Sequence, residues 1–329
     1  MRHLALSRLA RSILPVTYKL PMLRALSSRS PVILLYHGVP PRSANGGIDE
    51  ASFERHVLFL KHSCEMVTQE NIGKRRKASD RLQVLLSFDD GMRNNATVVA
   101  PILERHGVPA LFFVSSRHAT PGKYLWFVYL RALETHFPGK GFQFRDQYID
   151  LKPAARHASV KRLRQFLLTL TPHPAAMYQV IDEELPRLGD FMSEQVIADS
   201  YAGMTAEQTS GLAGSPLFSI GIHTVDHPLL TKCDSPELTR QVQDNRAWIE
   251  GVCNRPCDVV AYPSGDYNET VVEQTRTLGI THGYAVVPHT DRTSLYEIPR
   301  VGVYAASLDV LGFKVYWGNH LRRFKVGVG

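Results

Sequence analysis

Two adjacent carboxylates, Asp89 and Asp90, follow an apolar run from Leu82 to Phe88 and precede Gly91. The run is typical of a buried strand. Charged groups at the end of such a strand are costly to bury unless a metal or a proton transfer uses them. Asp-Asp-Gly is also good turn chemistry, so this stretch alone leaves a plain turn and a functional site equally open.

A pair of histidines, His223 and His227, directly follows a second apolar stretch, residues 217–222. On a helical turn, side chains four residues apart share a face and can bind one metal. Two imidazoles and one carboxylate leave coordination positions open, which is the pattern of a catalytic rather than a structural metal. Together with Asp89 and Asp90, the histidines favour a metal site over a turn.

Strand-like and helix-like stretches alternate through most of the chain. The expected strands cover residues 31–36, 82–88, 109–115, 217–223, 258–262, 280–287 and 296–303, and the expected helices cover 52–62, 94–106, a short stretch from 205, 235–251 and 268–278. Thr205 and Gln208 have the spacing of a capping box. About seven parallel strands alternating with helices predict an α/β barrel, in which functional residues gather at the strand carboxyl ends.

Residues from about 118 to 200 interrupt this alternation. They contain Trp126, basic helix-like stretches and several prolines, and they predict a mostly helical insertion. The expected organisation is therefore a basic N-terminal segment (1–30), a catalytic domain (31–310) that carries the insertion, and a basic C-terminal tail (311–329).

The formal charge of +7 is concentrated at the two ends of the chain. Six cations and no acid lie in residues 1–30, namely Arg2, Arg8, Arg11, Lys19, Arg24 and Arg29. Four more and no acid lie in residues 310–329, namely Lys314, Arg322, Arg323 and Lys325. The interior therefore has a net charge of −3, which argues against a nucleic-acid partner.

The N-terminal segment does not have the pattern of a signal peptide, because Arg8 and Arg11 interrupt its apolar residues. No run approaches the roughly 20 apolar residues of a membrane span. Leu6, Leu9 and Ile13 would share one helix face, which suits either an anionic membrane surface or packing on the domain. We therefore expect a cytoplasmic protein, with peripheral contact at the inner membrane face as one alternative.

Three motifs resemble those of the polysaccharide deacetylase family (NodB homology, carbohydrate esterase family 4). Ser87-Phe88-Asp89-Asp90-Gly91 is similar to the first motif, and the stretch from His223 to Pro228 is similar to the second, H-[ST]-x-x-H. Ala261-Tyr262-Pro263-Ser264-Gly265 resembles a third motif that lacks its usual arginine. The resemblance covers roughly residues 31–117 and 203–305.

The resemblance implies a distorted (β/α) barrel and metal-dependent hydrolysis of an N-acetyl or related N-acyl group on a sugar. It implies that Asp90, His223 and His227 hold a divalent metal, with Zn²⁺ favoured over Co²⁺, Ni²⁺ or Fe²⁺. Asp89 would be the general base, and the backbone N–H of Ser264 would stabilise the oxyanion.

The chain departs from the family at two points. The C-terminal leucine-x-histidine motif that supplies the general acid is missing. Tyr36-His37-Gly38-Val39 instead resembles the N-terminal motif of circularly permuted members, in which the histidine is the acid. The alternative for His37 is a strand-end histidine bonded to a neighbouring loop. Arg300 is a candidate to replace the missing arginine that orients the base.

The motifs define the chemistry but not the acceptor. An N-acylated glycan or a lipid-linked sugar is the expected substrate, and the enzyme would serve exopolysaccharide or glycolipid synthesis. Deformylation and O-acetyl ester hydrolysis could use the same site. A non-catalytic carbohydrate-binding protein on the same fold is the alternative from another class.

Overall fold

The computed structural model describes residues 30–43, 47–74, 81–287 and 294–323, with side chains up to Gly318. The predicted amphipathic helix at the N-terminus therefore lies outside the described residues. So do the charged residues 75–77 and the side chains of the last three cations.

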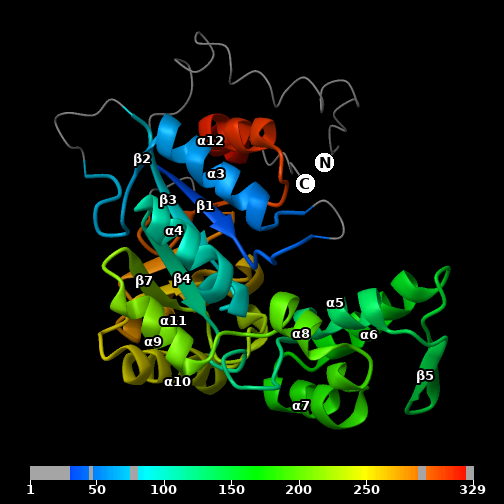
Figure 1. The fold of residues 1–329 in the computed structure, drawn as a ribbon. Helices are drawn as coiled ribbons and strands as arrows, with labels where there is room; N and C mark the ends of the chain where they lie inside the picture. Colours follow the sequence, from blue (N-terminus) through cyan, green and yellow to red (C-terminus); the bar gives the residue numbers. More distant parts are fainter. Residues whose placement is uncertain (1–29, 44–46, 75–80, 288–293, 324–329) are drawn as a thin grey trace.

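One parallel sheet curls into a nearly closed barrel surrounded by helices (Figure 1). Its path runs β10-β9-β8-β7-β4-β3-β1-β11, and β2 pairs with the start of β3. The strands are β1 (Val32–Tyr36), β2 (Glu65–Met66), β3 (Gln83–Phe88), β4 (Ala110–Val114), β7 (Phe218–Ile222), β8 (Val259–Ala261), β9 (His282–Ala285), β10 (Ile298–Pro299) and β11 (Val301–Gly302). The predicted α/β barrel is confirmed.

A single extended segment brings the two ends of this path together. β10 pairs with β9, and β11 pairs with β1. Only Arg300 separates β10 from β11. The barrel therefore closes around the backbone of Arg300, and the predicted count of about seven strands corresponds to treating β10 and β11 as one.

Helices follow the strands as expected. They are α3 (Glu50–Ser63), the π-helical turn η2 (Asn95–Val99), α4 (Ala100–His106), α9 (Ala206–Gly214), the 3₁₀ turns η5 (Leu230–Lys232) and η6 (Pro263–Gly265), α10 (Ser235–Cys253) and α11 (Glu269–Thr277). The predicted capping box is confirmed, because Thr205 and Gln208 each bond the other's backbone N–H. The stretch expected as one regular helix over 94–106 contains η2, a widened turn of the kind often found near functional sites.

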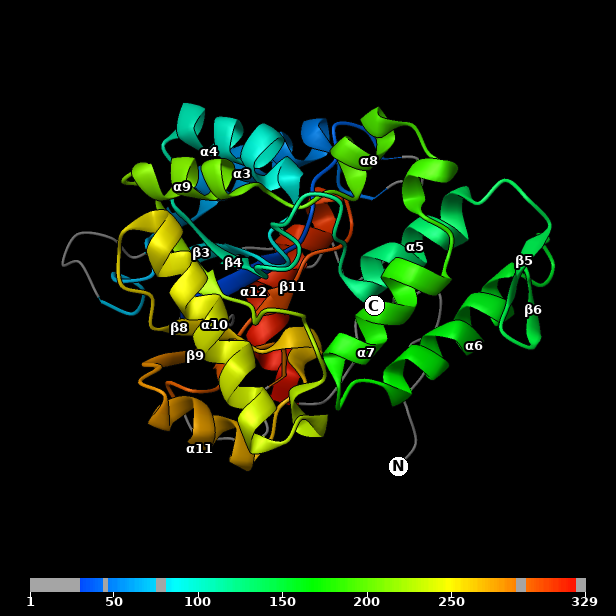
Figure 2. The same ribbon diagram turned by 90° about the horizontal axis from the view of Figure 1, so that it is seen from below.

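The insertion forms a separate layer beside the barrel (Figure 2). It contains α5 (Trp126–His136), the β5–β6 hairpin (Gly141–Phe144 and Gln147–Asp150), α6 (Arg156–Thr169), α7 (Pro174–Gln179), η3 (Val180–Glu184), η4 (Leu188–Asp190) and α8 (Glu194–Ser200). Its apolar side chains form a core cluster of their own. The predicted mostly helical character is therefore observed, with one hairpin in addition.

The C-terminal stretch packs on the barrel beside α3 (Figure 1). Residues expected from position 311 onward as a tail belong to α12 (Leu308–Arg323), and Leu311 and Val315 lie in the barrel's core cluster. Lys314 is also buried, and its Nζ donates to the Gly302 carbonyl at 2.8 Å. A domain boundary at residue 311 therefore falls inside a packed helix.

Across the described ranges, no helix has the length and apolar character needed to span a membrane.

Gly203 tests how tightly the returning insertion is fitted to the barrel. It forms an isolated bridge with Met92, and a Cβ added to it would overlap the carbonyl oxygen of His118. We expect Gly203→Ala to lower the free energy of unfolding by about 1–3 kcal/mol in urea denaturation, because the obstacle is backbone. A Cβ at Gly211 in α9 meets nothing within 4 Å. Gly211→Ala should therefore be neutral or stabilising, and equal effects for the two variants would contradict the tight fit.

Candidate metal centre and active site

Three motif side chains meet at the carboxyl ends of neighbouring strands. Asp90 follows β3, whereas His223 and His227 follow β7. Oδ1 of Asp90 lies 3.4 Å from Nε2 of His223 and 3.6 Å from Nε2 of His227. All three ligand atoms lie within 4.8 Å of one another, and all three residues are buried. The structure therefore brings together the ligand set expected from the sequence.

The loop that carries the histidines is not a helical turn, so the expected route to a shared face is wrong. Thr224 and His227 have positive φ angles of 65° and 51°, and Asp90 has a φ of 75°. Residues other than glycine rarely adopt this conformation, and strained backbone of this kind gathers at functional sites. Thr224 and His227 are thus two left-handed residues in the five-residue stretch 223–227, and this backbone turns both imidazoles toward Asp90.

The hydrogen bonds around this centre fit a divalent cation. Nδ1–H of His223 donates to the Ala261 carbonyl at 2.9 Å, which directs Nε2 toward the Asp90 carboxylate. Oδ1 of Asp90 is buried without a hydrogen-bond partner. A carboxylate and two imidazoles with an orphaned oxygen between them form a ligand set that suits zinc or its first-row neighbours.

Burial and mutual proximity shape the charges of these groups. Burial lowers the pKa of His227 to about 3, and His223 adds to that effect, so His227 is neutral at neutral pH. Burial also opposes charge on His223, but Asp89 and Asp90 outweigh it and raise the pKa of His223. Burial alone would raise the pKa of Asp90, yet the histidines hold it below its usual range. A divalent cation compensates the same carboxylate charge, so metal and proton compete for this site.

Asp89 is held by Arg300 from the segment that closes the barrel. Nη1 and Nη2 of Arg300 donate to Oδ1 and Oδ2 of Asp89 at 2.6 and 2.8 Å, and both side chains are buried. Burial would raise the pKa of Asp89, but the guanidinium, with help from His223, lowers it below its ordinary value. Asp89 is therefore ionised at neutral pH, in a fixed orientation. Arg300, the candidate to replace the missing arginine, therefore contacts the carboxylate that it was expected to orient.

The candidate ligands and Asp89 line a cavity of about 360 Å³. The two remaining predicted residues, His37 and Ser264, line it as well. His37 follows β1, and its ring stacks at 6.0 Å from that of Tyr304. Ser264 lies in η6 with a φ of 56°. The cavity therefore collects residues from β1, β3, β7, β8 and the chain after β11.

Asn94 is a positioning residue that the sequence did not reveal. Its Oδ1 accepts from the Val39 backbone N–H at 2.9 Å, and its Nδ2 donates to the Asp199 carbonyl at 2.9 Å. The loop of His37 is thereby tied to the end of the insertion. Its position just after the Asp-Asp-Gly stretch was the available signal, but the partners are 55 and 105 residues away.

The insertion fixes the histidine loop. Nε1 of Trp126 donates to the His227 carbonyl at 3.1 Å, and the Tyr178 hydroxyl donates to the Asp226 carbonyl at 2.7 Å. The ring of Phe127 lies 4.7 Å from that of His227. These contacts were not predicted, because the sequence offered no motif in the insertion to anchor them.

His118 supports Asp90 from behind. The His118 ring is buried, with Nδ1 3.0 Å from the Asp90 carbonyl and Nε2 3.0 Å from the Tyr201 carbonyl. Asp226, which lies between the two histidines in the sequence, is buried and accepts from Arg240 and Gln241. The candidate metal ligands are thus supported on several sides by hydrogen bonds.

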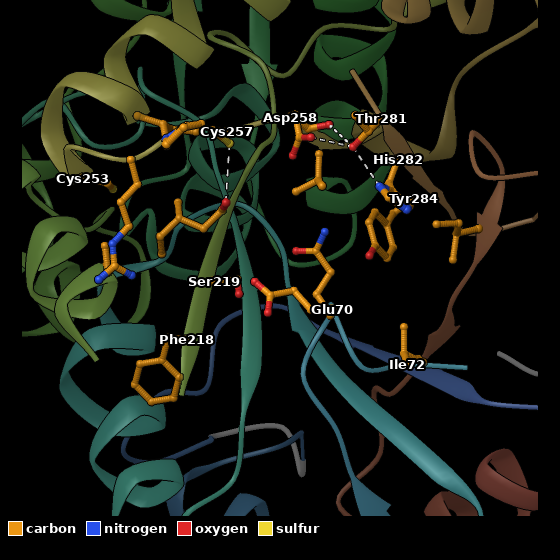
Figure 3. Close-up of a pocket in the computed structure, with 18 of the residues that line it drawn as sticks. Glu70, Ile72, Phe218, Ser219, Cys253, Cys257, Asp258, Thr281, His282 and Tyr284 are labelled. Atoms are coloured by element: carbon orange, nitrogen blue, oxygen red, sulfur yellow. Dashed lines mark hydrogen bonds between the residues drawn. The ribbon is translucent and has the colours of Figure 1, made fainter. Parts of the chain in front are cut away.

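A larger cavity, about 650 Å³, opens at the opposite end of the barrel, where strands begin (Figure 3). Its polar groups bond one another: the Thr281 hydroxyl donates to Asp258 and lies 2.9 Å from Nδ1 of His282. Burial raises the pKa of the Cys257 thiol to about 12, so this thiol stays protonated at neutral pH and is a poor nucleophile. Parallel barrels build active sites at the other end, and we assign no chemistry to this cavity.

The neighbouring carboxylates have separable roles in metal binding. We expect Asp90→Ala to weaken metal affinity by more than the roughly 10–100-fold typical of a change beyond the ligands. The Asp89 carboxylate is bonded to Arg300 and is not expected to be a ligand. Asp89→Asn should therefore still bind one equivalent of Zn²⁺ or Co²⁺. Elemental analysis after dialysis measures both. Equal metal content in Asp90→Ala and the unchanged protein would remove Asp90 from the ligand set.

The Arg300–Asp89 pair should be costly to break from one side. In metal-free protein, Arg300→Met should lower the free energy of unfolding by about 3–5 kcal/mol, because it leaves a buried carboxylate unpaired. Arg276→Met is the control, since its pair with Glu273 at 2.8 Å is exposed and should be worth at most about 1 kcal/mol. Adding Asp89→Asn to Arg300→Met should recover part of the loss. A cost as small as the control's would mean that water reaches the pair.

Comparison with known proteins agrees with this geometry. The family model described as polysaccharide deacetylase matches residues 76–131 and 180–283. These ranges include Asp89, Asp90, His223 and His227, and the gap between them lies within the insertion. A search of curated protein sequences finds no match.

Solved structures share the fold at low sequence identity. IcaB from Ammonifex degensii is 17% identical with a TM-score of 0.55, over 88% of this chain and 98% of its own. The Streptococcus pyogenes deacetylase PplD is 16% identical with a TM-score of 0.52, over 85% and 96%. A de-N-acetylase from Aggregatibacter actinomycetemcomitans is 15% identical with a TM-score of 0.53, over 85% and 97%. The family-model match and the motif residues assembled at one end of the barrel make this chain similar to the polysaccharide deacetylase family.

Proposed function

We propose that this protein is a metal-dependent hydrolase that removes an N-acetyl or related N-acyl group from a sugar in a polysaccharide or a lipid-linked glycan. The observation that carries this proposal is the buried cluster of Asp90, His223 and His227, which opens into the same cavity as Asp89 and His37. A divalent metal held by that cluster, most simply Zn²⁺, would supply Lewis-acid chemistry, because it would polarise an acyl oxygen and lower the pKa of water.

Asp89 is assigned as the general base. Its carboxylate is ionised, lies beside the ligand cluster and is oriented by two hydrogen bonds from Arg300. As water adds to the acyl carbon, Asp89 accepts the proton that the water loses. Arg300 acts through Asp89 and touches no substrate in this assignment.

His37 is assigned as the general acid. When the C–N bond breaks, the amine needs a proton, and a protonated imidazole can deliver it. His37 lines the cavity at the end of β1, and Asn94 holds the backbone that follows it. This role agrees with the resemblance of Tyr36-His37-Gly38-Val39 to the motif of circularly permuted family members.

The backbone N–H of Ser264 is assigned to the oxyanion. Gly265 and Asp266 donate the backbone hydrogen bonds that close the turn η6, so the N–H of Ser264 is not needed for that purpose. Ser264 is exposed at the cavity wall. A preorganised donor at that place would stabilise the charge that develops on the acyl oxygen.

The wider setting of the reaction is part of the same proposal. A role in exopolysaccharide or glycolipid synthesis in the cytoplasm, with the basic ends touching the inner membrane face, is supported by the charge distribution of the sequence. Deformylation or O-acetyl ester hydrolysis would use the same residues. Binding of glycans without metal dependence would instead identify a non-catalytic protein.

Acetate release from N-acetylglucosamine oligomers by zinc- or cobalt-loaded protein tests the proposal. We expect Asp89→Asn and His37→Asn each to lower the rate by about 10²–10⁴-fold while keeping the metal, because each removes one proton transfer. His282→Asn is the control, since it lies in the cavity at the opposite end of the barrel. Unchanged rates in Asp89→Asn would refute the base. No release by fully metallated protein would shift the proposal to a lipid-linked or non-acetyl substrate.

A further inference from the structure

A second cavity adjoins the active site on the side of the insertion. Its volume is about 390 Å³, and it lies between α5 and α6. Trp126, Phe127 and Arg164 line both this cavity and the one that contains the metal ligands. A ligand whose reacting group lies at the metal centre can therefore extend into this second cavity, which we call the cationic groove.

The cationic groove has an excess of positive charge. Arg131, Lys161 and Arg164 line it and are exposed, and within the described part of the chain none of them is paired with a carboxylate. The acid that lines it, Glu134, is bonded by Nδ1 of His157 at 2.8 Å. Arg131 also donates to the Ser200 carbonyl at 3.5 Å, so Lys161 and Arg164 are the stronger candidates for contact with a ligand. Cations gathered without carboxylate partners at the edge of an active site repel one another, and a bound anion would relieve that repulsion.

Helix α6 supplies two of these cations, Lys161 and Arg164, from one of its faces. Its sequence from Arg156 to Thr169 contains four Lys or Arg and no Asp or Glu. Arg156 donates to three backbone carbonyls, and Arg162 donates to the Ser159 hydroxyl. Lys161 and Arg164, which are three residues apart and share a helix face, are the two that face the groove.

The junction with the active site is aromatic. The guanidinium of Arg164 lies 5.7 Å from the ring centroid of Trp126, a cation–π contact that keeps it near the active-site cavity. Phe127 lines both cavities, and its ring lies 4.7 Å from that of His227. A sugar ring can pack on such an aromatic surface while a charged substituent reaches the cations.

We propose that the cationic groove binds a phosphate or diphosphate group attached to the sugar whose N-acyl group reaches the metal centre. This inference rests on the proposed function, and it narrows the substrate class to a glycosyl phosphate or diphosphate. Phosphate oxygens suit the converging cations, because an Arg fork binds them in pairs and a Lys adds a point charge. The same chemistry is found in nucleotide-linked and lipid-linked sugars.

Equilibrium binding separates this inference from catalysis. The probes are UDP-N-acetylglucosamine, a short-chain prenyl diphosphate N-acetylglucosamine, and neutral N-acetylglucosamine oligomers, titrated into metal-loaded Asp89→Asn protein so that no turnover occurs. We expect Arg164→Gln to weaken binding of a diphosphate probe by roughly ten- to a hundredfold and to leave the neutral oligomers unaffected. Lys161→Gln should act in the same direction. Arg162→Gln, on the same helix but not lining the groove, should change neither.

The outcomes distinguish the two proposals. Preference for either diphosphate probe over the neutral oligomers, lost in Arg164→Gln, supports the groove, and the tighter probe identifies the nucleotide or lipid source. Equal affinity for charged and neutral probes, or an equal loss in Arg162→Gln, overturns it. Acetate release from neutral oligomers without any diphosphate preference would leave the proposed function intact and remove the groove. Diphosphate preference in the titration, without hydrolysis of any probe by the protein with Asp89 intact, would support the groove and contradict the proposed function.

Discussion

The buried ion pair between Asp89 and Arg300 is the constraint on which the rest of the site depends. A lone carboxylate in this place would be too costly to keep charged, and Arg300 provides two hydrogen bonds at 2.6 and 2.8 Å. The guanidinium comes from the single residue between β10 and β11, where the sheet closes on itself. The segment that closes the barrel therefore also supplies the cation that keeps the candidate base ionised. Asp90, the next residue, turns the other way with a φ of 75° and faces the histidines instead.

Two neighbouring acids thus have opposite environments. Asp89 is fully compensated by a protein cation, whereas Asp90 has an orphaned oxygen and two imidazoles within 3.6 Å. The first arrangement suits proton transfer, and the second suits a metal. Gly91 permits this divergence: it also has a positive φ, and a Cβ there would press on the side chain of Val114. A larger residue at position 91 would have to adopt this strained φ and would force Val114 to move.

The sequence was sufficient for features that depend on local pattern. Three such features follow from spacing and residue type: the buried strands that precede Asp89 and His223, the capping box at Thr205, and the alternation of strands and helices. Contacts between distant segments were beyond it. Asn94 with Val39, Trp126 with His227 and the burial of Lys314 depend on how separate elements pack. The histidine loop was misjudged as a helical turn because i, i+4 spacing does not distinguish a helix from a loop with left-handed residues.

The hydrogen bonds from Trp126 and Tyr178 to the histidine loop constrain how this protein can evolve. The layer that walls the candidate active-site cavity also supports His227, a candidate metal ligand, so both the shape of that cavity and the geometry of the candidate metal centre depend on the same helices. Mutational drift in α5 or α7 would alter both together. New substrate preferences would therefore arise more easily in α6, whose exposed side chains line the cavity without bonding the ligand loop. Selection could reshape that helix while the catalytic apparatus stays fixed.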